Sequence, residues 1–253
     1  MPHHDPVPIR HKPEVPPDYA AFAEVIIDEG VRIVETAGNN PRSIITQFKN
    51  AGIIVIQKCT TIRHAKSALK LGVDLLSIYG YECAGHVGEH DITNFILLSR
   101  ARQELGVPFI ASSRFADGNG LAAALALGAE GIKMDTRFMS TVEVPIHYHV
   151  KDAIINAQET DTALILRRLT NTSRMFSKKV PQEALAVEKA NKTGKFSEIV
   201  SYVSGKRGRE VFLDGDVEQG LSYYLIHICS APEDAFFSIS KSCRYGMLDK
   251  LLE

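Results

Sequence analysis

Short apolar segments alternate with amphipathic segments from about residue 31 to residue 134, and this alternation constrains the fold more than any other feature of the chain. The units repeat at intervals of roughly 20–35 residues, as consecutive strand–helix units do. The apolar segments are hydrophobic at nearly every position, which is typical of strands buried on both faces of a parallel sheet. The pattern therefore predicts an α/β protein built around a parallel sheet.

Glycines and capping residues set the expected boundaries of these units. Thr61 is a plausible N-cap for the helix that follows it, and Gly72 ends that helix. The expected strands are 31–37, 53–58, 73–79, 107–111 and 131–134, and the expected helices are 18–30, 43–50, 61–71, 92–105 and 118–127. Five strands are thus visible, whereas a complete (β/α)₈ barrel, for which 253 residues would be an ordinary length, has eight.

The chain divides into three regions by pattern. Residues 1–17 are rich in proline, which removes amide donors and fixes φ, so we expect an irregular N-terminus. Residues 18–145 carry the strand–helix units and are expected to form a partial (β/α) barrel. Residues 146–253 lose the pattern, and we expect a helical lid or C-terminal extension there. The barrel is expected to lack its first two or three strand–helix units.

Composition excludes several classes of function. The formal net charge of −1 provides no field that would attract nucleic acid or an anionic membrane. No run of 18 apolar residues predicts a membrane span, and the first residues lack a secretory signal, so we expect a cytoplasmic protein. The four cysteines form no C-x-x-C pair, so we expect reduced thiols and no metal site.

Ligands of parallel α/β folds bind at the carboxyl ends of the strands, so the residues there are the first candidates for a site. The small-residue turns at 112–120 and at 135–136 are suited to a phosphate group. Lys58 can supply a cation, and His86, in a loop bounded by glycines, can act as a base near neutral pH. A structural histidine and a lysine that merely reaches solvent remain open alternatives.

Four segments, taken in order, resemble a known family. They are Ile56–Thr60, Tyr81–Gly88, Phe115–Ala129 and Thr136–Phe138. Together they resemble the nitronate monooxygenase family, formerly called 2-nitropropane dioxygenase, whose relatives include NAD(P)H:quinone reductases. The resemblance covers about residues 17–220. It implies an oxidoreductase, a flavoprotein with a TIM-type barrel that holds FMN non-covalently.

The resemblance also implies roles for individual residues. His86 would abstract the α-proton of a nitroalkane or lie beside the nitronate, which dioxygen then oxidises to a carbonyl compound and nitrite. In the quinone reductase branch, NAD(P)H reduces the same flavin. The flavin contacts of the family correspond to Lys58, Tyr79, Ala84, Gly85, Ser112, Ser113, Arg114, Phe115, Asp135 and Thr136.

Four positions depart from the family pattern. Ser113-Arg114 replaces Gly-Gly, Asp135 replaces a glycine, and Tyr79 stands where aspartate is frequent. A Cβ atom hinders a close approach of the backbone to a phosphate, and a carboxylate repels it, which Arg114 could offset.

Three functions therefore remain open: an FMN-dependent nitronate monooxygenase, an NAD(P)H:quinone reductase, and a degenerate or truncated non-catalytic relative. The expected partners are a nitronate or quinone, dioxygen and NAD(P)H. Exposed sheet edges would favour a homo-oligomer.

Overall fold

The structure is a computed structural model and describes residues 18–38, 41–190, 199–203 and 205–218. These residues form two compact units. The parallel-sheet unit comprises described residues 18–38, 41–82 and 90–133, and the antiparallel-sheet unit comprises described residues 83–89, 134–190, 199–203 and 205–218. The predictions for residues 1–17 and 219–253 lie outside the described residues.

The parallel-sheet unit has the predicted strand–helix alternation. Its sheet has the order β1-β2-β3-β5-β6, and every neighbouring pair is parallel. The strands are β1 (Ile33–Thr36), β2 (Ile54–Cys59), β3 (Leu75–Tyr79), β5 (Phe109–Ser112) and β6 (Gly131–Lys133). The helices are α1 (Tyr19–Asp28), α2 (Arg42–Asn50), α3 (Ile62–Leu69), α4 (Asn94–Glu104) and α5 (Gly118–Ala126). The α/β class and the five strands are therefore confirmed.

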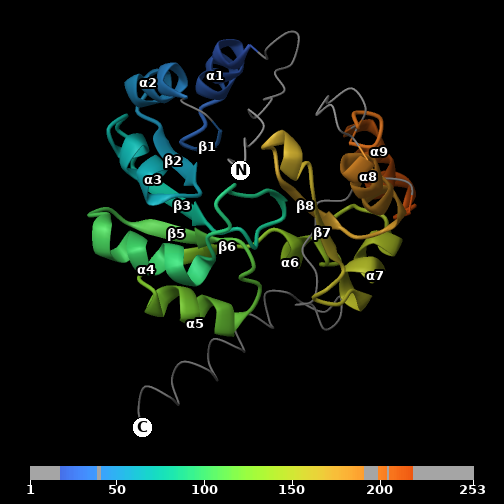
Figure 1. Ribbon diagram of the computed structural model, residues 1–253. Coiled ribbons are helices and arrows are strands. Elements are labelled where there is room, and N and C mark those ends of the chain that lie inside the picture. The colour runs from blue at the N-terminus through green and yellow to red at the C-terminus, as the bar shows by residue number, and fades with distance from the viewer. Residues whose placement is uncertain (1–17, 39–40, 191–198, 204, 219–253) are drawn as a thin grey trace, which may run out of the picture. The chain divides into compact units, whose positions relative to one another are not determined.

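All five helices pack on one face of this sheet, as Figure 1 shows. The side chains of Val55, Leu76 and Ile78 are fully buried between the strands and the helices. The helices contribute Ile45 and Leu98 to the same cluster, also fully buried. Helices on a single face are what a barrel requires, because its strands must keep their other face for the interior, whereas a doubly wound sheet carries helices on both faces.

The opposite face of the sheet is buried at Ser77 and Ser112 but open near its β1 edge, so the prediction of strands buried on both faces was correct only in part. The side chains of Ile33 and Ile54, which pair in register on that face, are 56% and 47% exposed. They lie on β1, the edge strand, and on its neighbour β2. An apolar strand sequence therefore overstated how completely both faces are covered.

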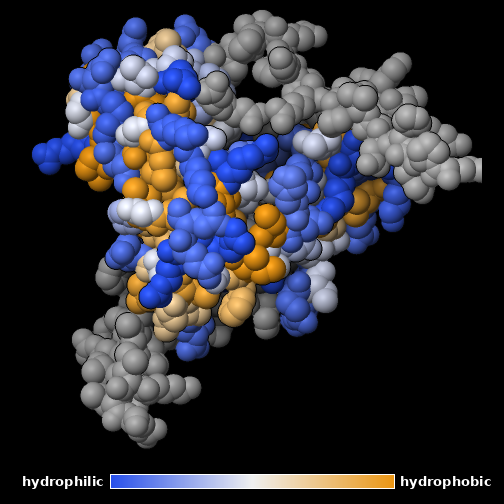
Figure 2. Space-filling view, turned by 60° about the vertical axis from the view of Figure 1, so that its left-hand side comes forward, coloured by the Kyte–Doolittle hydropathy of each residue, from blue (hydrophilic) through white to orange (hydrophobic). Residues whose placement is uncertain are grey.

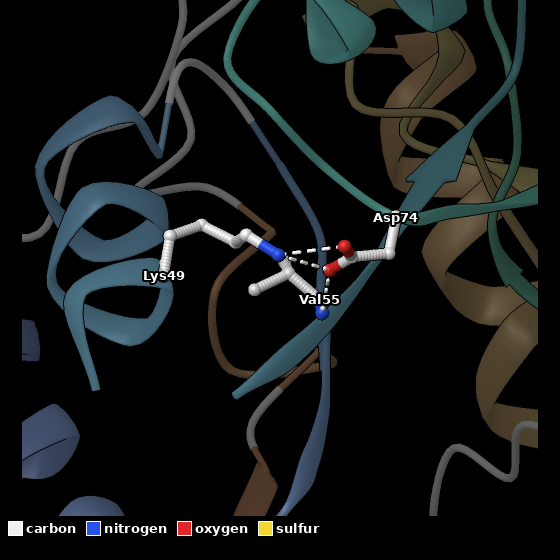
Figure 3. Close-up of polar contacts among 3 residues, drawn as sticks. All are labelled: Lys49, Val55 and Asp74. Atoms are coloured by element: carbon white, nitrogen blue, oxygen red, sulfur yellow. Dashed lines mark hydrogen bonds and ion pairs between the residues drawn. The ribbon is translucent and has the colours of Figure 1, made fainter. Parts of the chain in front are cut away.

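Two polar contacts fix the ends of elements in this unit. The Thr61 hydroxyl accepts a hydrogen bond from the His64 amide at 3.1 Å, which confirms Thr61 as an N-cap. The Asp74 carboxylate, just before β3, accepts hydrogen bonds from Lys49 of α2 at 2.6 Å and from the Val55 amide of β2 at 2.8 Å (Figure 3). Asp74 therefore ties a helix to two strands.

The outward surface of the helices is mixed in polarity. Figure 2 shows orange apolar areas among blue polar ones on this side of the molecule. Phe95 of α4 is 73% exposed, and Tyr19, Phe22 and Val25 of α1 are also exposed. Among the described residues, no helix is both long and apolar enough to cross a bilayer.

The antiparallel-sheet unit has strand order β4-β8-β7, and both pairs are antiparallel. Its elements are β4 (Gly85–His86), α6 (Thr136–Met139), α7 (Tyr148–Asn156), β7 (Thr162–Ile165), the 3₁₀ turn η1 (Arg167–Leu169), β8 (Ser173–Phe176), α8 (Lys179–Ala190) and α9 (Gly205–Asp214). Helices were predicted after residue 145, but the small sheet was not. β7 and β8, the strands of this sheet that follow residue 145, have only four residues each. They mix polar with apolar side chains, so no clear period marks them.

Candidate functional site

The face of the parallel sheet opposite the helices carries a group of polar side chains beside the apolar Ile33 and Ile54, and it is called the polar face here. Strand register places Lys58 beside Ser77, and Tyr79 beside Ser112. Directly paired residues and residues two apart on a strand share a face. The polar face therefore carries Glu35, Lys58, Ser77, Tyr79, Ser112 and Lys133. The predicted cofactor residues on these strands thus lie on one surface, at the carboxyl ends of β2, β3 and β5.

Lys58 and Tyr79 interact directly on this face. The Lys58 ammonium lies 4.7 Å from the centroid of the Tyr79 ring, within the range of a cation–π contact. Both side chains are half-buried. A tyrosine at this position, unlike the aspartate frequent in the family, does not cancel the positive charge of Lys58. The pair therefore offers a cation and an aromatic face to an anionic or aromatic ligand.

The strand ends lead into a turn with unusual backbone geometry. The hydroxyls of Ser77 and Ser112 are buried and lie 2.7 Å apart, which joins the ends of β3 and β5. After β5 the chain enters the left-handed region at Ser113, with φ 87°, and at Arg114, with φ 55°. Two consecutive non-glycine residues there cost free energy. The backbone thus keeps the conformation for which a glycine pair is suited, although the side chains differ.

Asn94, the first residue of α4, holds this turn in place. Its Nδ2 donates to the Ser113 carbonyl at 2.9 Å, and its Oδ1 accepts from the Gly80 amide at 2.6 Å. The Asn94 amide in turn donates to the Glu82 carboxylate at 2.9 Å. A Cβ atom on Gly80 would stand 2.5 Å from the Asn94 backbone nitrogen, so only glycine fits there. Asn94 thereby links the ends of β3 and β5.

The Ser113 hydroxyl is the unexplained polar atom of the turn. Ser113 is 9% exposed, and its Oγ has no hydrogen-bond partner. Nearby, α5 begins with Asp117, whose carboxylate accepts a hydrogen bond from the Gly120 amide at 2.7 Å. Phe115 packs against the start of this helix, since a Cβ on Gly120 would lie 3.4 Å from it. A buried hydroxyl without a partner, on a strained turn, fits a site that is completed by a polar ligand.

His86 lies in the antiparallel-sheet unit, on the short strand β4. Its Nδ1 is 2.8 Å from the hydroxyl of Ser173, the residue opposite it on β8. The residue as a whole is exposed, whereas Ser173 is fully buried. Desolvation of the ring lowers the pKa of His86 from its ordinary value of 6.5, although a hydrogen bond with the Asn171 backbone and the charge of Glu89 oppose this. His86 is therefore neutral at pH 7.

The remaining predicted site residues belong to the same unit. Ala84 and Gly85 precede His86 in one loop, where Gly85 has φ 70° and both residues are half-buried. Asp135 is exposed and precedes α6, in which Thr136 is the first residue. The Asp135 side chain does not cap this helix of four residues. Ala84, Gly85 and His86 are therefore consecutive residues of one segment. Asp135 and Thr136 lie at a different place in the chain, at the start of α6.

Two cysteines lie near these residues in the sequence, and both are buried. Burial raises the pKa of the Cys59 thiol to about 12, because Cys59 points toward the helices, where it is 2% exposed. It therefore carries no thiolate at neutral pH and is no nucleophile. Cys83 is buried as well, with its Sγ 3.6 Å from the His86 carbonyl, so it helps to close the histidine loop.

Sequence reasoning missed Asn94 and Ser173. Asn94 stands at the start of a helix, where Asn is common for capping, so its contacts with two strand ends had no distinct signal. Ser173 meets His86 across 87 positions of sequence, through a pair of strands that was not predicted. The sequence therefore indicated candidate residues at the strand ends but not the residues that hold them in place.

Comparisons with known proteins identify a matching family model and several similar proteins. A sequence model described as "Nitronate monooxygenase" matches residues 9–195. A "(3aS,4S,5R,7aS)-5-hydroxy-7a-methyl-1-oxo-octahydro-1H-indene-4-carboxyl-CoA dehydrogenase" of Rhodococcus jostii is 34% identical over 141 residues, which are 56% of this chain and 39% of the relative. A "Probable nitronate monooxygenase" of Staphylococcus haemolyticus is 32% identical over 136 residues, 50% of this chain and 38% of the relative. The chain thus spans about two fifths of these relatives.

A solved structure matches over more of the chain. FabK from Thermotoga maritima superposes with a TM-score of 0.80 and 27% sequence identity, and the match covers 94% of this chain and 76% of FabK. FabK is a TIM barrel, which agrees with helices on a single face of the parallel sheet. The TIM-type fold expected from the sequence is thereby confirmed, although in the described residues the parallel strands form an open sheet.

Proposed function

The chain belongs to the nitronate monooxygenase family, a family of oxidoreductases, and from this premise we propose that it is an FMN-dependent nitronate monooxygenase. The proposed reaction oxidises an alkyl nitronate with dioxygen to a carbonyl compound and nitrite. The observation that carries the proposal is His86, whose Nδ1 lies 2.8 Å from the Ser173 hydroxyl and whose ring desolvation lowers its pKa, so that the imidazole is mostly neutral near pH 7. A neutral imidazole on a strand can accept a proton from a carbon acid.

The turn after β5 fits a flavin phosphate. The partnerless, buried Ser113 hydroxyl and the left-handed backbone of Ser113 and Arg114 favour a bound anion there. Lys58 supplies a positive charge on the same polar face, and Tyr79 supplies an aromatic surface. The residues proposed to hold FMN are Lys58, Tyr79, Ala84, Gly85, Ser112, Ser113, Arg114, Phe115, Asp135 and Thr136. When bound, FMN supplies the electron acceptor for the oxidation.

In this proposal the protein itself carries out one chemical step, the transfer of a substrate proton to His86. A neutral nitroalkane loses the proton on the carbon next to the nitro group. The C–H bond breaks, its electron pair moves into the nitro group, and the proton bonds to the imidazole. A nitronate supplied ready-made needs no such step, so His86 would then act only as a polar neighbour of the anion.

The non-catalytic alternative rests on a specific observation. The side chains of Ser113 and Arg114 occupy positions where the family has glycine, and Asp135 adds a carboxylate. A Cβ atom hinders a close approach of the backbone to a phosphate and the Asp135 carboxylate repels it, whereas the Arg114 guanidinium would offset that charge. Ser113 and Arg114 nevertheless keep the left-handed backbone, which both residue types disfavour. A turn under no constraint would relax, so this conformation favours a functional turn.

The visible spectrum of the purified protein, after incubation with FMN and removal of free flavin, tests the proposal. We expect about one flavin per chain, and oxygen consumption with nitrite release when an alkyl nitronate is added. NADH with a quinone, assayed in parallel, distinguishes the quinone reductase. A colourless protein that cannot be reconstituted would contradict both enzyme functions and support the non-catalytic relative.

The variant His86→Asn tests the role of the histidine. We expect it to lose activity on neutral nitroalkanes by about 10²-fold or more, the usual worth of a general base, and to keep activity on preformed nitronates. Equal loss on both substrates would rule out the base role. His64→Asn, in which an exposed histidine on α3 is replaced, is the matched control and should behave as wild type.

A further inference from the structure

Ser173 stands directly behind the His86 ring, and the family resemblance assigns it no role. It is fully buried, and its Oγ lies 2.8 Å from His86 Nδ1. We infer that Ser173 is a positioning residue that keeps the His86 proton on Nδ1, so that Nε2 presents its lone pair to the substrate. This inference rests on the proposed role of His86 as a base.

The position of Ser173 is fixed by the backbone on both sides. Ser173 is paired with His86 in the β4–β8 ladder and with Ile165 in the β7–β8 ladder. The Val87 amide donates to the Thr172 carbonyl at 3.0 Å. A central strand with two partners leaves the Ser173 side chain little freedom, so its hydroxyl is a defined reference point for the ring.

A carboxylate holds the residue before Ser173. Glu89 accepts hydrogen bonds from the Thr172 amide at 2.8 Å and from the Thr172 hydroxyl at 2.6 Å. Glu89 lies three residues after His86, so the same short segment carries both the histidine and the group that fixes its support. Charge-assisted hydrogen bonds of this kind are among the stronger ones in proteins.

The Asn171 carbonyl is a second hydrogen-bond partner of the Ser173 hydroxyl. A carbonyl only accepts, and that of Asn171 lies 3.5 Å from Ser173 Oγ. When the hydroxyl hydrogen points toward it, the lone pairs of Oγ face Nδ1, and Nδ1 must be the donor. The bond made by one ring nitrogen sets the state of the other.

The consequence for the chemistry is a defined proton acceptor. With Nδ1 protonated, Nε2 carries the lone pair that takes the substrate proton. The C–H bond breaks, its electron pair stays on the substrate as the nitronate, and a new N–H bond forms at Nε2. The imidazolium then returns this proton to water, while the Nδ1 proton stays on its hydrogen bond to Ser173. The reverse tautomer would present an N–H to the substrate and could not accept its proton.

Long-range ¹H–¹⁵N NMR of protein labelled in histidine reads this state directly, without flavin or turnover. His86 is assigned by the loss of its signals in His86→Asn, and spectra are recorded at pH 8, where the ring is neutral. We expect a protonated Nδ1 and a bare Nε2 in the wild type. In Ser173→Ala we expect the Nε2-protonated form to gain population. A wild type with its proton on Nε2, or a tautomer unchanged in Ser173→Ala, would overturn the inference.

Two further variants separate positioning from stability. Ser140→Ala removes another buried hydroxyl of the same unit, which bonds the Arg137 carbonyl at 2.8 Å, and should leave the His86 signals unchanged. Ser173→Thr keeps a hydroxyl at this position, so we expect its His86 tautomer to be closer to that of the wild type than the tautomer in Ser173→Ala. A shift of the His86 signals in Ser140→Ala equal to that in Ser173→Ala would assign the effect to general loosening and overturn the inference.

Kinetics connect the tautomer to the proposed function. We expect Ser173→Ala to lower kcat/KM for a neutral nitroalkane at least about 10-fold and to spare a preformed nitronate. Equal loss on both substrates would overturn the positioning role. If the wild type turns over neither substrate, the proposed function fails, but the NMR result still decides whether Ser173 sets the His86 tautomer.

Discussion

Glu35 and Lys133 form an ion pair, with Oε2 and Nζ 2.5 Å apart, although they stand on β1 and β6, the two edges of the parallel sheet. In a flat sheet, four strand spacings would separate these edges by about 19 Å, which the two side chains cannot span. The sheet must therefore curve toward its polar face. The ion pair connects edges that in a complete barrel would be joined through further strands.

A double-mutant cycle on this pair measures its contribution. We expect Glu35→Gln and Lys133→Met each to lower the free energy of unfolding by about 0.5–1 kcal/mol, because the pair is only partly buried. Their effects should be less than additive in urea denaturation, since each removes the same interaction. Additive losses would show that the two side chains do not interact.

Asp74 makes stability depend on pH. Burial raises the pKa of Asp74, but the hydrogen bond and charge of Lys49 and the hydrogen bond of the Val55 amide outweigh this and lower it below 3.8. Because the native pKa is the lower one, the contribution of Asp74 is complete above the unfolded pKa and is lost as pH falls through the native pKa. We expect Asp74→Asn to be less stable than wild type at pH 7, and the gap to close toward pH 3. A gap that persists at pH 3 would contradict this.

Asn94 should be costly to truncate. Asn94→Ala leaves the buried Gly80 amide and the Ser113 carbonyl without their partners, so we expect a loss of roughly 2–3 kcal/mol in the free energy of unfolding. FMN affinity, measured by quenching of flavin fluorescence, should fall as well, because the turn after β5 loses its anchor. Asn156→Ala, in an exposed contact on α7, is the control and should have little effect on either quantity.

Ser113→Gly separates strain from binding. Glycine accepts φ 87° without penalty, so we expect the flavin-free protein to gain about 0.5–1 kcal/mol of stability. If the Ser113 hydroxyl contacts the flavin phosphate, the same variant binds FMN more weakly. Unchanged FMN affinity in Ser113→Gly would remove the hydroxyl from the binding site.

The pH dependence of turnover should reflect the His86 environment. Desolvation lowers the pKa of the His86 ring and outweighs the charge of Glu89, which raises it. The deprotonated ring is the base, so kcat/KM for a neutral nitroalkane should rise with pH, with its midpoint below 6.5. Glu89→Gln should move the midpoint lower still. A midpoint above 6.5 would contradict the lowered pKa.

The repeating part of the fold could be predicted from sequence because its contacts are local. Each strand of the parallel sheet is followed by a helix that packs beside it, so period and glycine positions were sufficient to locate β2, α3 and β3. The same order placed Lys58 and Tyr79 at neighbouring strand ends. Their mutual contact was not predicted, because a side-chain approach of 4.7 Å depends on register.

The rest depends on contacts between distant residues or on single-residue geometry. The pairing of β4 with β8 joins His86 to Ser173 with no pattern in either short strand. The turn between β7 and β8 relies on Leu166 and Thr170 in the left-handed region, held by the buried Glu188, whose carboxylate accepts from the Leu166 amide at 2.8 Å. Neither residue type signals such a conformation, so sequence reasoning favoured helices there.

The pairing of β4 with β8 also orders the assembly of the protein during synthesis. Residues 90–133 lie between the two parts of the antiparallel-sheet unit along the chain, and they belong to the parallel-sheet unit. Chains fold in the order in which they leave the ribosome, and local contacts form before distant ones. The strands of the parallel sheet can therefore associate while the segment at residues 83–89 still has no partner. His86 acquires the neighbours that define its chemistry only after residue 173 has been made.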